Sequence, residues 1–350
     1  MPINTLTPPM KTPLISILLI NHNGQEHLEY CLPSLMETNY PKDKMEIILV
    51  DNQSTDDSIN FVKNTFPHVK IIKAQNKGYG AGINRGLKES RGDYIAVLNV
   101  DIKFDPDWLV NILKPLQQDN NVGIAGPLLL DFDAKELPDE IKVPCFSKYG
   151  YPYHYTLNIG AAPTPGPPLL PIETIWVPGA VMLIKREVFE KIGGFDPIYF
   201  LYYEDFDFCF RTRIAGYKIF LVPASLVYHK ESALIDPVFT PPEKVFFTTQ
   251  NSIITFLKNY SLLSLLIYGL LFFILRFVDI INDLIHPQFR RFGLAKLRAF
   301  YGTLTQMPTV IKQRRKVQKL RIVTDQEIFK LNRGDSLWKV AKQKAISKKN

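Results

Sequence analysis

The sequence predicts an α/β fold, in which a three-layer α/β/α domain with a mainly parallel sheet is followed by a helical region. Continuous apolar runs at residues 15–20, 45–50 and 94–98 are typical of strands buried on both faces of a parallel sheet. Residues 26–38 have the apolar spacing of a helix, and strand and helix alternate at short intervals. Hydrophobic residues make up 46% of the 350 and charged residues 22%, which excludes a disordered or low-complexity chain.

The remaining elements of the α/β domain follow along the chain. Residues 69–73 predict a further strand and residues 84–90 a helix. The stretch 131–172 is rich in proline and aromatic residues, so we expect an irregular excursion there. It is not a domain boundary, because strand-like sequence resumes at 176–184 and helix and strand signals alternate over 185–228.

We expect three parts in the chain. Residues 1–12 form a loose lead-in, residues 13–235 the α/β domain, and residues 236–350 a helical C-terminal region. The three cysteines are widely spaced, which excludes a disulfide framework and fits a reducing compartment. The first apolar run lacks the flanks of a signal peptide, so we expect the body to stay in the cytosol.

Polar residues follow three of the predicted strands directly. They are residues 21–23, 51–52 and 99–101. Ligands of a parallel α/β sheet bind at the carboxyl ends of its strands, so these residues are expected to meet at one edge. A single Asp at such a position is as readily explained by a helix cap or a turn, but three clusters after three strands favour a binding site.

Asp101 is a candidate ligand for Mg²⁺ or Mn²⁺. A carboxylate on a loop suits either ion, which would also hold substrate phosphates. Asp101 could instead cap the next helix, although Asp105 is better placed for that. His229 follows an apolar strand-like run and is either a structural histidine or, together with Asp101, a further metal ligand.

Glu204 and Asp205 form a second candidate site. They lie among aromatic residues, and burial beside aromatic rings raises the pKa of a carboxyl group, as suits a general base. Adjacent residues on a helix point about 100° apart, so one would face the substrate while the other orients it or pairs with Arg211 or Arg213. The alternative is an ordinary helix start with acids in its first turn.

The glycine-rich residues 78–82 (GYGAG) invite a dinucleotide-binding interpretation. The pattern is G-x-G-x-G rather than G-x-G-x-x-G, and it does not follow the first strand, which argues against that interpretation. We expect these glycines to let the backbone approach a ligand or a neighbouring loop.

Taken together, these segments resemble glycosyltransferase family 2, which has the GT-A fold, and look most similar to its rhamnosyltransferase-like members. The resemblance runs from about residue 13 to residue 229 and is weaker beyond. Each segment is short, but their order and spacing are specific. The segments are ILLINHNG (17–24), VDNQSTDD (50–57), NKGYGAGIN (76–84), LNVD (98–101), GAVMLIKREVFEKIGGFD (179–196), YYEDFDFCFR (202–211) and VYH (227–229).

The resemblance implies roles for the matching residues. Asp101 would bind Mg²⁺ or Mn²⁺ and through it the diphosphate, with His229 as a further ligand. Asp205, paired with Glu204, would be the general base that deprotonates the acceptor hydroxyl. The residues implied to bind the nucleotide sugar are Ile20, His22 and Asp51 at the nucleobase, together with Asn84, Asn99, Asp101 and Gly179.

Two residues depart from the family pattern, and one absent motif restricts the kind of transfer that we expect. Asn99 stands at the first acid of the D-x-D motif, so metal ligation rests on fewer charges. His22 stands where the family often has Tyr, so stacking on the base would differ. The Gln-x-x-Arg-Trp motif of processive polymerases is absent from the sequence, which argues for transfer of one sugar, or few.

The C-terminal region predicts contact with an anionic membrane surface. Residues 290–350 carry 17 Lys and Arg against 3 Asp and Glu, whereas the first 289 residues have a net charge of −6. Residues 259–275 are a 17-residue run without charge, which is short for a spanning helix and could also be a buried core helix. Nucleotide sugars are cytosolic and basic segments stay inside. We therefore expect a re-entrant or in-plane insertion at the cytoplasmic face of the cell membrane, with residues 312–321 on anionic lipid.

These observations predict a metal-dependent, inverting glycosyltransferase. It would transfer one sugar from a nucleotide-diphosphate sugar, dTDP-rhamnose or a UDP-sugar, to a glycan or lipid-linked acceptor in cell-surface polysaccharide biosynthesis. Inverting transfer needs a base opposite the leaving nucleotide and a cation at the diphosphate, the roles of Asp205 and Asp101. The alternative is a non-catalytic scaffold of a membrane assembly, against which the Glu204–Asp205 pair argues. Nucleic acid is not an expected partner, because no nucleic-acid motif accompanies the basic charge.

Overall fold

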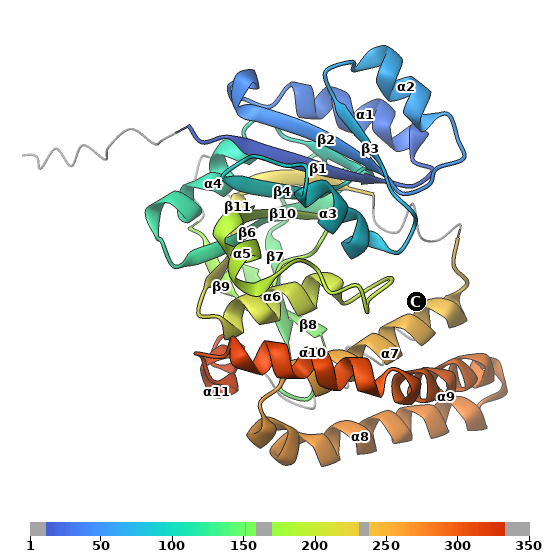
Figure 1. Ribbon diagram of the computed structural model, residues 1–350. Helices are drawn as coiled ribbons and strands as arrows, with labels where there is room; N and C mark the ends of the chain where they lie inside the picture. Colours follow the sequence, from blue (N-terminus) through green and yellow to red (C-terminus); the bar gives the residue numbers. More distant parts are fainter. Residues whose placement is uncertain (1–11, 151, 159–169, 231–237, 333–350) are drawn as a thin grey trace, which may run out of the picture.

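The computed structural model describes residues 12–150, 152–158, 170–230 and 238–332. Within these residues a nine-stranded sheet has helices on both faces, and further helices from the C-terminal region pack on one side of this domain (Figure 1). The predicted three-layer α/β fold is confirmed. Of the lead-in expected at 1–12, only Thr12 belongs to the described residues. The end of the basic tail, after residue 332, also lies outside them.

The N-terminal half of the sheet is parallel, in the order β3-β2-β1-β4. Its strands are β1 (Ile15–Asn21), β2 (Met45–Asp51), β3 (Lys70–Lys73) and β4 (Tyr94–Asn99). The connecting helices are α1 (Gln25–Met36), α2 (Ser58–Thr65) and α3 (Tyr79–Leu87), and a short 3₁₀ turn, η1 (Lys42–Lys44), precedes β2. β1 is buried along its whole length, as a continuous apolar run in a central strand requires.

The second half of the sheet mixes strand directions. Its strands are β10 (Val181–Lys185), β6 (Val122–Asp131), β11 (Lys218–His229), β5 (Ile102–Phe104) and β9 (Ile172–Thr174). β10 runs antiparallel to β4 and β6, β11 runs parallel to β6, and β5 and β9 run antiparallel to β11. The sheet is therefore parallel in its first half and mixed beyond, because β10 enters it in the reverse direction. The helices of this half are α4 (Trp108–Gln118), α5 (Arg186–Ile192) and α6 (Glu204–Ile214).

Three predicted boundaries differ from the structure. The stretch 131–172 contains a hairpin of β7 (Glu140–Phe146) and β8 (Pro152–Asn158), while residues 159–169 lie outside the described part. The strand expected over 176–184 begins only at Val181. The helix expected over 84–90 begins at Tyr79, inside the glycine-rich segment, because those glycines let α3 lie close against the sheet. A Cβ on Gly82, for example, would come within 2.9 Å of the Asn52 side chain.

The C-terminal region is helical, as predicted. Its elements are α7 (Pro241–Asn259), α8 (Leu262–Ile285), the 3₁₀ turn η2 (Pro287–Phe289), α9 (Arg290–Thr305), α10 (Met307–Lys319) and α11 (Asp325–Phe329). α7 packs against α6, α9 and α10, and α8 packs on α9 and lies furthest from the sheet (Figure 1). A hydrophobic cluster joins the two regions, with Phe206 and Phe210 of α6 against Phe256 of α7 and Phe272 of α8.

Helix α8 extends beyond the charge-free run that the sequence marks. It continues through Arg276 to Ile285, and the buried Arg276 side chain donates a hydrogen bond to the carbonyl of Gly150 (3.1 Å). Within the described residues, α8 is the one helix long and apolar enough to cross a membrane.

Candidate active site

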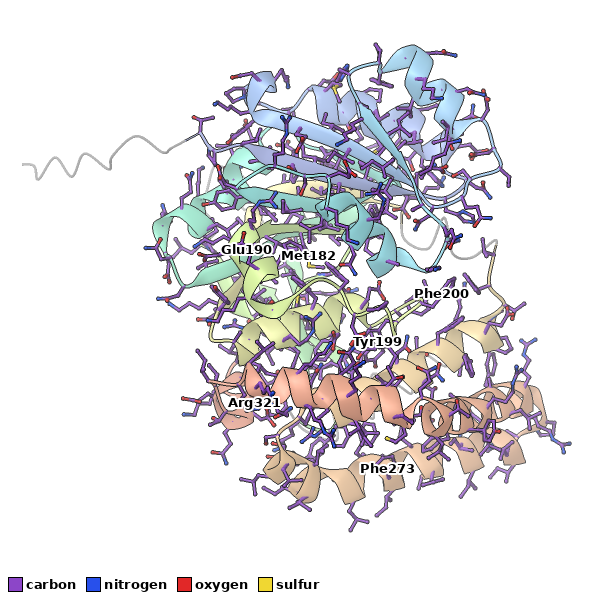
Figure 2. The ribbon with its side chains drawn as sticks, in the orientation of Figure 1. Met182, Glu190, Tyr199, Phe200, Phe273 and Arg321 are labelled. Atoms are coloured by element: carbon purple, nitrogen blue, oxygen red, sulfur yellow. The ribbon has the colours of Figure 1, made fainter. Side chains whose placement is uncertain are left out.

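A cavity of about 410 Å³ lies at the carboxyl ends of β1, β2 and β4. In the sheet Asn21 lies opposite Asp51 and Ile20 opposite Asn99, so the three polar clusters meet at one edge as predicted. The loop that leads to α6, which carries Phe200 (Figure 2), and the residues before α7 form the facing wall. The cavity is lined by Ile20, His22, Asn52, Asn76, Gly78, Tyr79, Asn99, Asp101, Leu129, Pro178, Gly179, Ala180, Phe200, Leu201, Tyr202, Glu204, Asp205, His229, Val238 and Phe239.

The end of the cavity expected to bind the nucleobase is built from two loops held together. His22 Nδ1 lies 2.8 Å from the carbonyl oxygen of Asn52, so the ring is oriented by the loop after β2. The Asn52 side chain in turn lies 3.5 Å from the carbonyl oxygen of Gly78, and its own Oδ1 is buried without a hydrogen-bond partner. An unpaired buried acceptor costs stability, so this oxygen is available for a ligand donor.

Two of the predicted site residues do not line the cavity. Asp51 Oδ1 accepts a hydrogen bond from the backbone of Ser54 (3.0 Å) and so shapes the loop after β2. Asn84 is engaged at both ends of its amide: Oδ1 accepts from Phe195 N (2.9 Å), and Nδ2 donates to Phe195 O (2.7 Å). Asn84 therefore lies outside the cavity lining and holds the segment after α5.

Asp101 and His229 lie side by side in the cavity wall. The pairing of β5 and β11 sets His229 opposite Ile102, and His229 Nε2 comes to 3.4 Å from Asp101 Oδ1. Asp101 Oδ1 and both ring nitrogens of His229 are buried and lack hydrogen-bond partners. Polar atoms in this state are expected to serve a ligand.

This pair fits a divalent cation that is completed by its substrate. A carboxylate oxygen and an imidazole nitrogen are ligands that Mn²⁺ accepts, and Mg²⁺ commonly takes only one or two protein ligands beside phosphates and water. Within the described residues no group of three or more His, Cys, Asp or Glu is placed to bind a metal, so the remaining ligands must come from elsewhere.

Glu204 and Asp205 begin α6 on the facing wall. Asp205 accepts hydrogen bonds from the backbone N–H of Gly179 at Oδ2 (2.9 Å) and of Phe206 at Oδ1 (2.7 Å). Glu204 Oε2 is buried without a hydrogen-bond partner. The two carboxyl groups thus differ, one fixed by backbone donors and the other unpaired.

Burial changes the acidity of both carboxyl groups. The pKa of Glu204 is raised to about 8, by burial first and by the neighbouring Asp205 charge second. Burial also raises the pKa of Asp205, and its hydrogen bonds from Gly179 and Phe206 oppose this rise. Neighbouring buried carboxyl groups with raised pKa values are typical of acid–base sites.

Close backbone packing holds this wall in place. A Cβ on Gly179 would lie 2.9 Å from Asp205 Cβ, and one on Gly78, at φ +93°, would lie 2.3 Å from the carbonyl oxygen of Phe200. Tyr202 and Tyr203 have φ of 65° and 71°, a left-handed conformation that costs a non-glycine residue about 1–3 kcal/mol. Gly78 of the glycine-rich segment therefore lets the backbone pack closely against a neighbouring loop, at Phe200. This is one of the two alternatives, a ligand or a neighbouring loop, that the sequence left open.

Sequence reasoning missed several cavity residues. Asn76 and Tyr79 lie within a segment that the resemblance had marked, and Tyr79 donates a hydrogen bond to the carbonyl of Gly179 (2.9 Å). Phe239 could not be predicted as a cavity residue, because it lies outside every segment that carries the resemblance. It packs edge-on against Phe200, with ring centroids 6.3 Å apart.

Comparison with known proteins identifies the family of this chain and relatives that share its sequence. A family model described as "Glycosyl transferase family 2" matches residues 16–193, more than half of the chain. The N-acetylglucosaminyl-diphospho-decaprenol L-rhamnosyltransferase of Mycobacterium tuberculosis is 28% identical over 242 residues, which cover 63% of this chain and 77% of that protein. The rhamnosyltransferase WbbL of Escherichia coli (strain K12) is 27% identical over 230 residues, which cover 62% of this chain and 83% of that protein.

A solved structure supports the fold. The crystal structure of GalNAc-T7 with UDP, GalNAc and Mn²⁺ aligns with a TM-score of 0.55 at 17% identity, over 70% of this chain. This chain spans about half of that one (48%). The likeness establishes the GT-A fold.

Proposed function

Because the chain belongs to glycosyl transferase family 2 and is rhamnosyltransferase-like, we propose that it transfers one sugar, with inversion, from a nucleotide-diphosphate sugar to a glycan or lipid-linked acceptor. One observation carries the proposal: a single cavity has an Asp–His pair on one wall and two carboxyl groups of raised pKa on the other. Inverting transfer needs those two functions in one place. The process served would be cell-surface polysaccharide biosynthesis.

In the proposed reaction Asp205 is the general base. The acceptor oxygen forms a bond to the anomeric carbon while the bond from that carbon to the diphosphate breaks, and the hydroxyl proton passes to Asp205. The backbone donors of Gly179 and Phe206 favour the charged form of Asp205 and fix its direction. Glu204, with its pKa near 8, is mostly protonated at neutral pH and would donate a hydrogen bond that orients the acceptor.

Asp101 and His229 would hold the divalent cation, Mg²⁺ or Mn²⁺. When bound, the cation would offset the negative charge that grows on the leaving diphosphate. Two observations support this proposal. Asp101 Oδ1 and His229 Nε2 lie 3.4 Å apart without hydrogen-bond partners, and the GalNAc-T7 structure is named as containing Mn²⁺.

The donor would lie along the sheet edge. Ile20 and His22, with Asn52, would contact the nucleobase, and Asn99 and Gly179 would lie near the sugar diphosphate. Asp51 and Asn84 would support the donor site indirectly, through the loops that they shape. The rhamnosyltransferase relatives favour dTDP-rhamnose as donor, with UDP-sugars as the alternative.

The test is a donor panel. Full-length protein is assayed for binding and hydrolysis of UDP-, dTDP- and GDP-sugars, with and without Mn²⁺ or Mg²⁺, and for transfer to a polyprenyl-diphosphate N-acetylglucosamine acceptor. Metal-dependent transfer from one donor, with inverted configuration in the product, is expected. Donor or glycan binding without turnover would instead support the non-catalytic scaffold, which the paired carboxyl groups disfavour.

We further propose that the helical region lies on the cytoplasmic face of the cell membrane, in the plane of the lipid. Apart from Asn282, the exposed residues of α8 are apolar: Leu262, Leu263, Leu266, Ile267, Leu270, Ile274, Phe277, Val278, Ile281 and Ile285. Leu294, Leu297, Tyr301 and Leu304 extend this surface onto α9. We call these fourteen residues the α8–α9 apolar face. A patch of this extent is unusual on a soluble surface and suits lipid.

The inward side of α8 argues against a spanning helix. Lys296 of α9 lies 2.6 Å from both Asp279 and Asp283 of α8, and Asp283 and Arg276 are buried against the protein. A spanning α8 would lose these partners or carry the charges into hydrocarbon. Exposed basic residues on the neighbouring helices, including Arg298 and Arg315, would meet anionic headgroups.

A further inference from the structure

Helix α7 carries a row of buried polar side chains along one side. Asn251, Thr255, Lys258 and Asn259 follow at helical spacing, and each is at most 2% exposed. Thr255 Oγ1 lies 2.8 Å from the hydroxyl of Tyr199, in the segment that leads to α6. Buried polar groups are retained only with partners, so this row indicates a specific fit between α7 and that segment.

The far end of the row holds the chain on both sides of the left-handed turn at Tyr202 and Tyr203. Lys258 Nζ lies 2.6 Å from Asp196 Oδ2 and 2.8 Å from Asp207 Oδ1, and Asn259 donates to Asp207 Oδ1 (2.8 Å). Asp196 precedes the turn and Asp207 follows it. α7 therefore clamps the segment that carries Glu204.

Asn251 is the member of the row that touches the turn itself. Its Nδ2 donates to the carbonyl oxygens of Leu201 (2.7 Å) and Tyr202 (2.9 Å), which uses both of its N–H groups. Tyr202 and Tyr203 are the two consecutive residues in the left-handed region, and Glu204 follows directly. Such a turn persists only when its surroundings hold it.

We infer that Asn251 is a positioning residue: by holding the carbonyls of the left-handed turn, it keeps Glu204 and Asp205 directed into the cavity. α7 lies beyond the 16–193 region that the family model matches, so this role belongs to the helical region of this chain. The inference rests on the proposed transferase function. It makes the C-terminal helices part of the active site as well as the proposed membrane contact.

The experiment compares full-length Asn251→Ala and Asn251→Leu, which removes the donors but keeps the volume, with the wild type. The kcat for transfer should fall about 10- to 100-fold, as for a misplaced catalytic group, while donor KM and metal-dependent donor binding stay unchanged. The low-pH limb of the kcat profile should move to lower pH, because a loosened turn lets water reach the carboxyl groups. Asn251→Gln, which retains the donors, should recover part of kcat.

Gln250→Ala is the matched control. Gln250 lies one position earlier on α7 and is 6% exposed, but it faces Gly302 of α9 and not the turn. This variant should keep the wild-type kcat and pH profile at a comparable melting temperature.

A double-mutant cycle with Tyr203→Gly tests the coupling directly. Glycine adopts the left-handed conformation without strain, so the effect of Asn251→Ala should shrink in the Tyr203→Gly background. Additive effects, an unchanged kcat and pH limb in folded Asn251 variants, or equal loss of donor binding would overturn the inference. If the wild type itself performs no transfer, the proposed function fails first, and that result is distinct from all of these.

Discussion

Asp101 Oδ1 and His229 Nε2 lie 3.4 Å apart, and neither atom has a hydrogen-bond partner. The short strand β5 brings them together, because its antiparallel register with β11 sets Ile102 opposite His229. A buried carboxylate and imidazole without hydrogen-bond partners are placed to take up a ligand.

Removing either side chain should therefore weaken metal-dependent donor binding. Asp101→Ala and His229→Ala should each raise the Mn²⁺ concentration needed for donor binding by at least about tenfold, as expected from losing a metal contact. Calorimetric titration of donor at a series of Mn²⁺ concentrations measures the effect. Asp105→Ala, on the loop after β5, is the control. Full donor binding by the Asp101 variant without metal would remove the pair from this role.

Replacing the proposed base should separate chemistry from binding. Asp205→Asn keeps the shape of the side chain but cannot accept a proton, so transfer should fall by about 10²–10⁴-fold while donor binding is largely kept. In the wild type, transfer should decline as the pH falls, beginning above the ordinary range for an aspartate because burial raises the pKa of Asp205. Steady-state kinetics over a pH series, with donor binding measured in parallel, test both. Unchanged turnover would exclude Asp205 from the mechanism.

The raised pKa of Glu204 also has a consequence for stability. The folded chain keeps a proton on Glu204 up to about pH 8, whereas the unfolded chain releases it near the ordinary value of 4.5. Between these values the folded state binds more protons, so the contribution of Glu204 to stability decreases as the pH rises. Glu204→Gln is neutral in both states, and its melting temperature relative to wild type should increase from pH 5 to pH 8.

Glu327→Gln gives the opposite sign and serves as the control. Hydrogen bonds from Thr324 lower the pKa of Glu327, so its charged form stabilises the fold at neutral pH and this benefit is lost in acid. The Gln variant should be less stable than wild type at pH 7, with a difference that narrows on acidification. If the difference in melting temperature between Glu204→Gln and the wild type did not change with pH, the pKa of Glu204 would not be raised in the folded chain.

Much of the fold and part of the site follow from the sequence alone. The apolar runs at β1, β2 and β4 predict a parallel sheet, and a parallel sheet brings the residues at its carboxyl ends together whatever the side chains are. Asp101, Asn99 and His22 were found in this way, and Glu204 and Asp205 by their charge among aromatic residues.

The remainder depends on contacts that local sequence does not encode. The position of Asn84 in the sequence predicts a site residue. In the structure, however, its amide is hydrogen-bonded to the backbone of Phe195, which lies far along the chain. The charge-free run of the sequence ends at Arg276, yet helix α8 continues to Ile285 with Arg276 buried and hydrogen-bonded to the carbonyl of Gly150. Phe239 enters the cavity, and Asn251 contacts the loop that leads to α6, through tertiary packing of the C-terminal region.

The α8–α9 apolar face makes the last prediction. Leu266 and Leu270 are 72% and 75% exposed on α8, so Leu266→Glu/Leu270→Glu should leave the fold and donor binding intact but strongly reduce binding to vesicles containing anionic lipid. Sedimentation with anionic and zwitterionic vesicles at two salt concentrations measures this, and wild-type binding should be weaker on neutral lipid and at high salt. Leu170→Glu, equally exposed (77%) but outside the helical region, is the control. An in-plane helix should be released from membranes by alkaline carbonate. Retention of the wild type after that wash would mean that α8 spans the bilayer, and its inward charges would then have to find new partners.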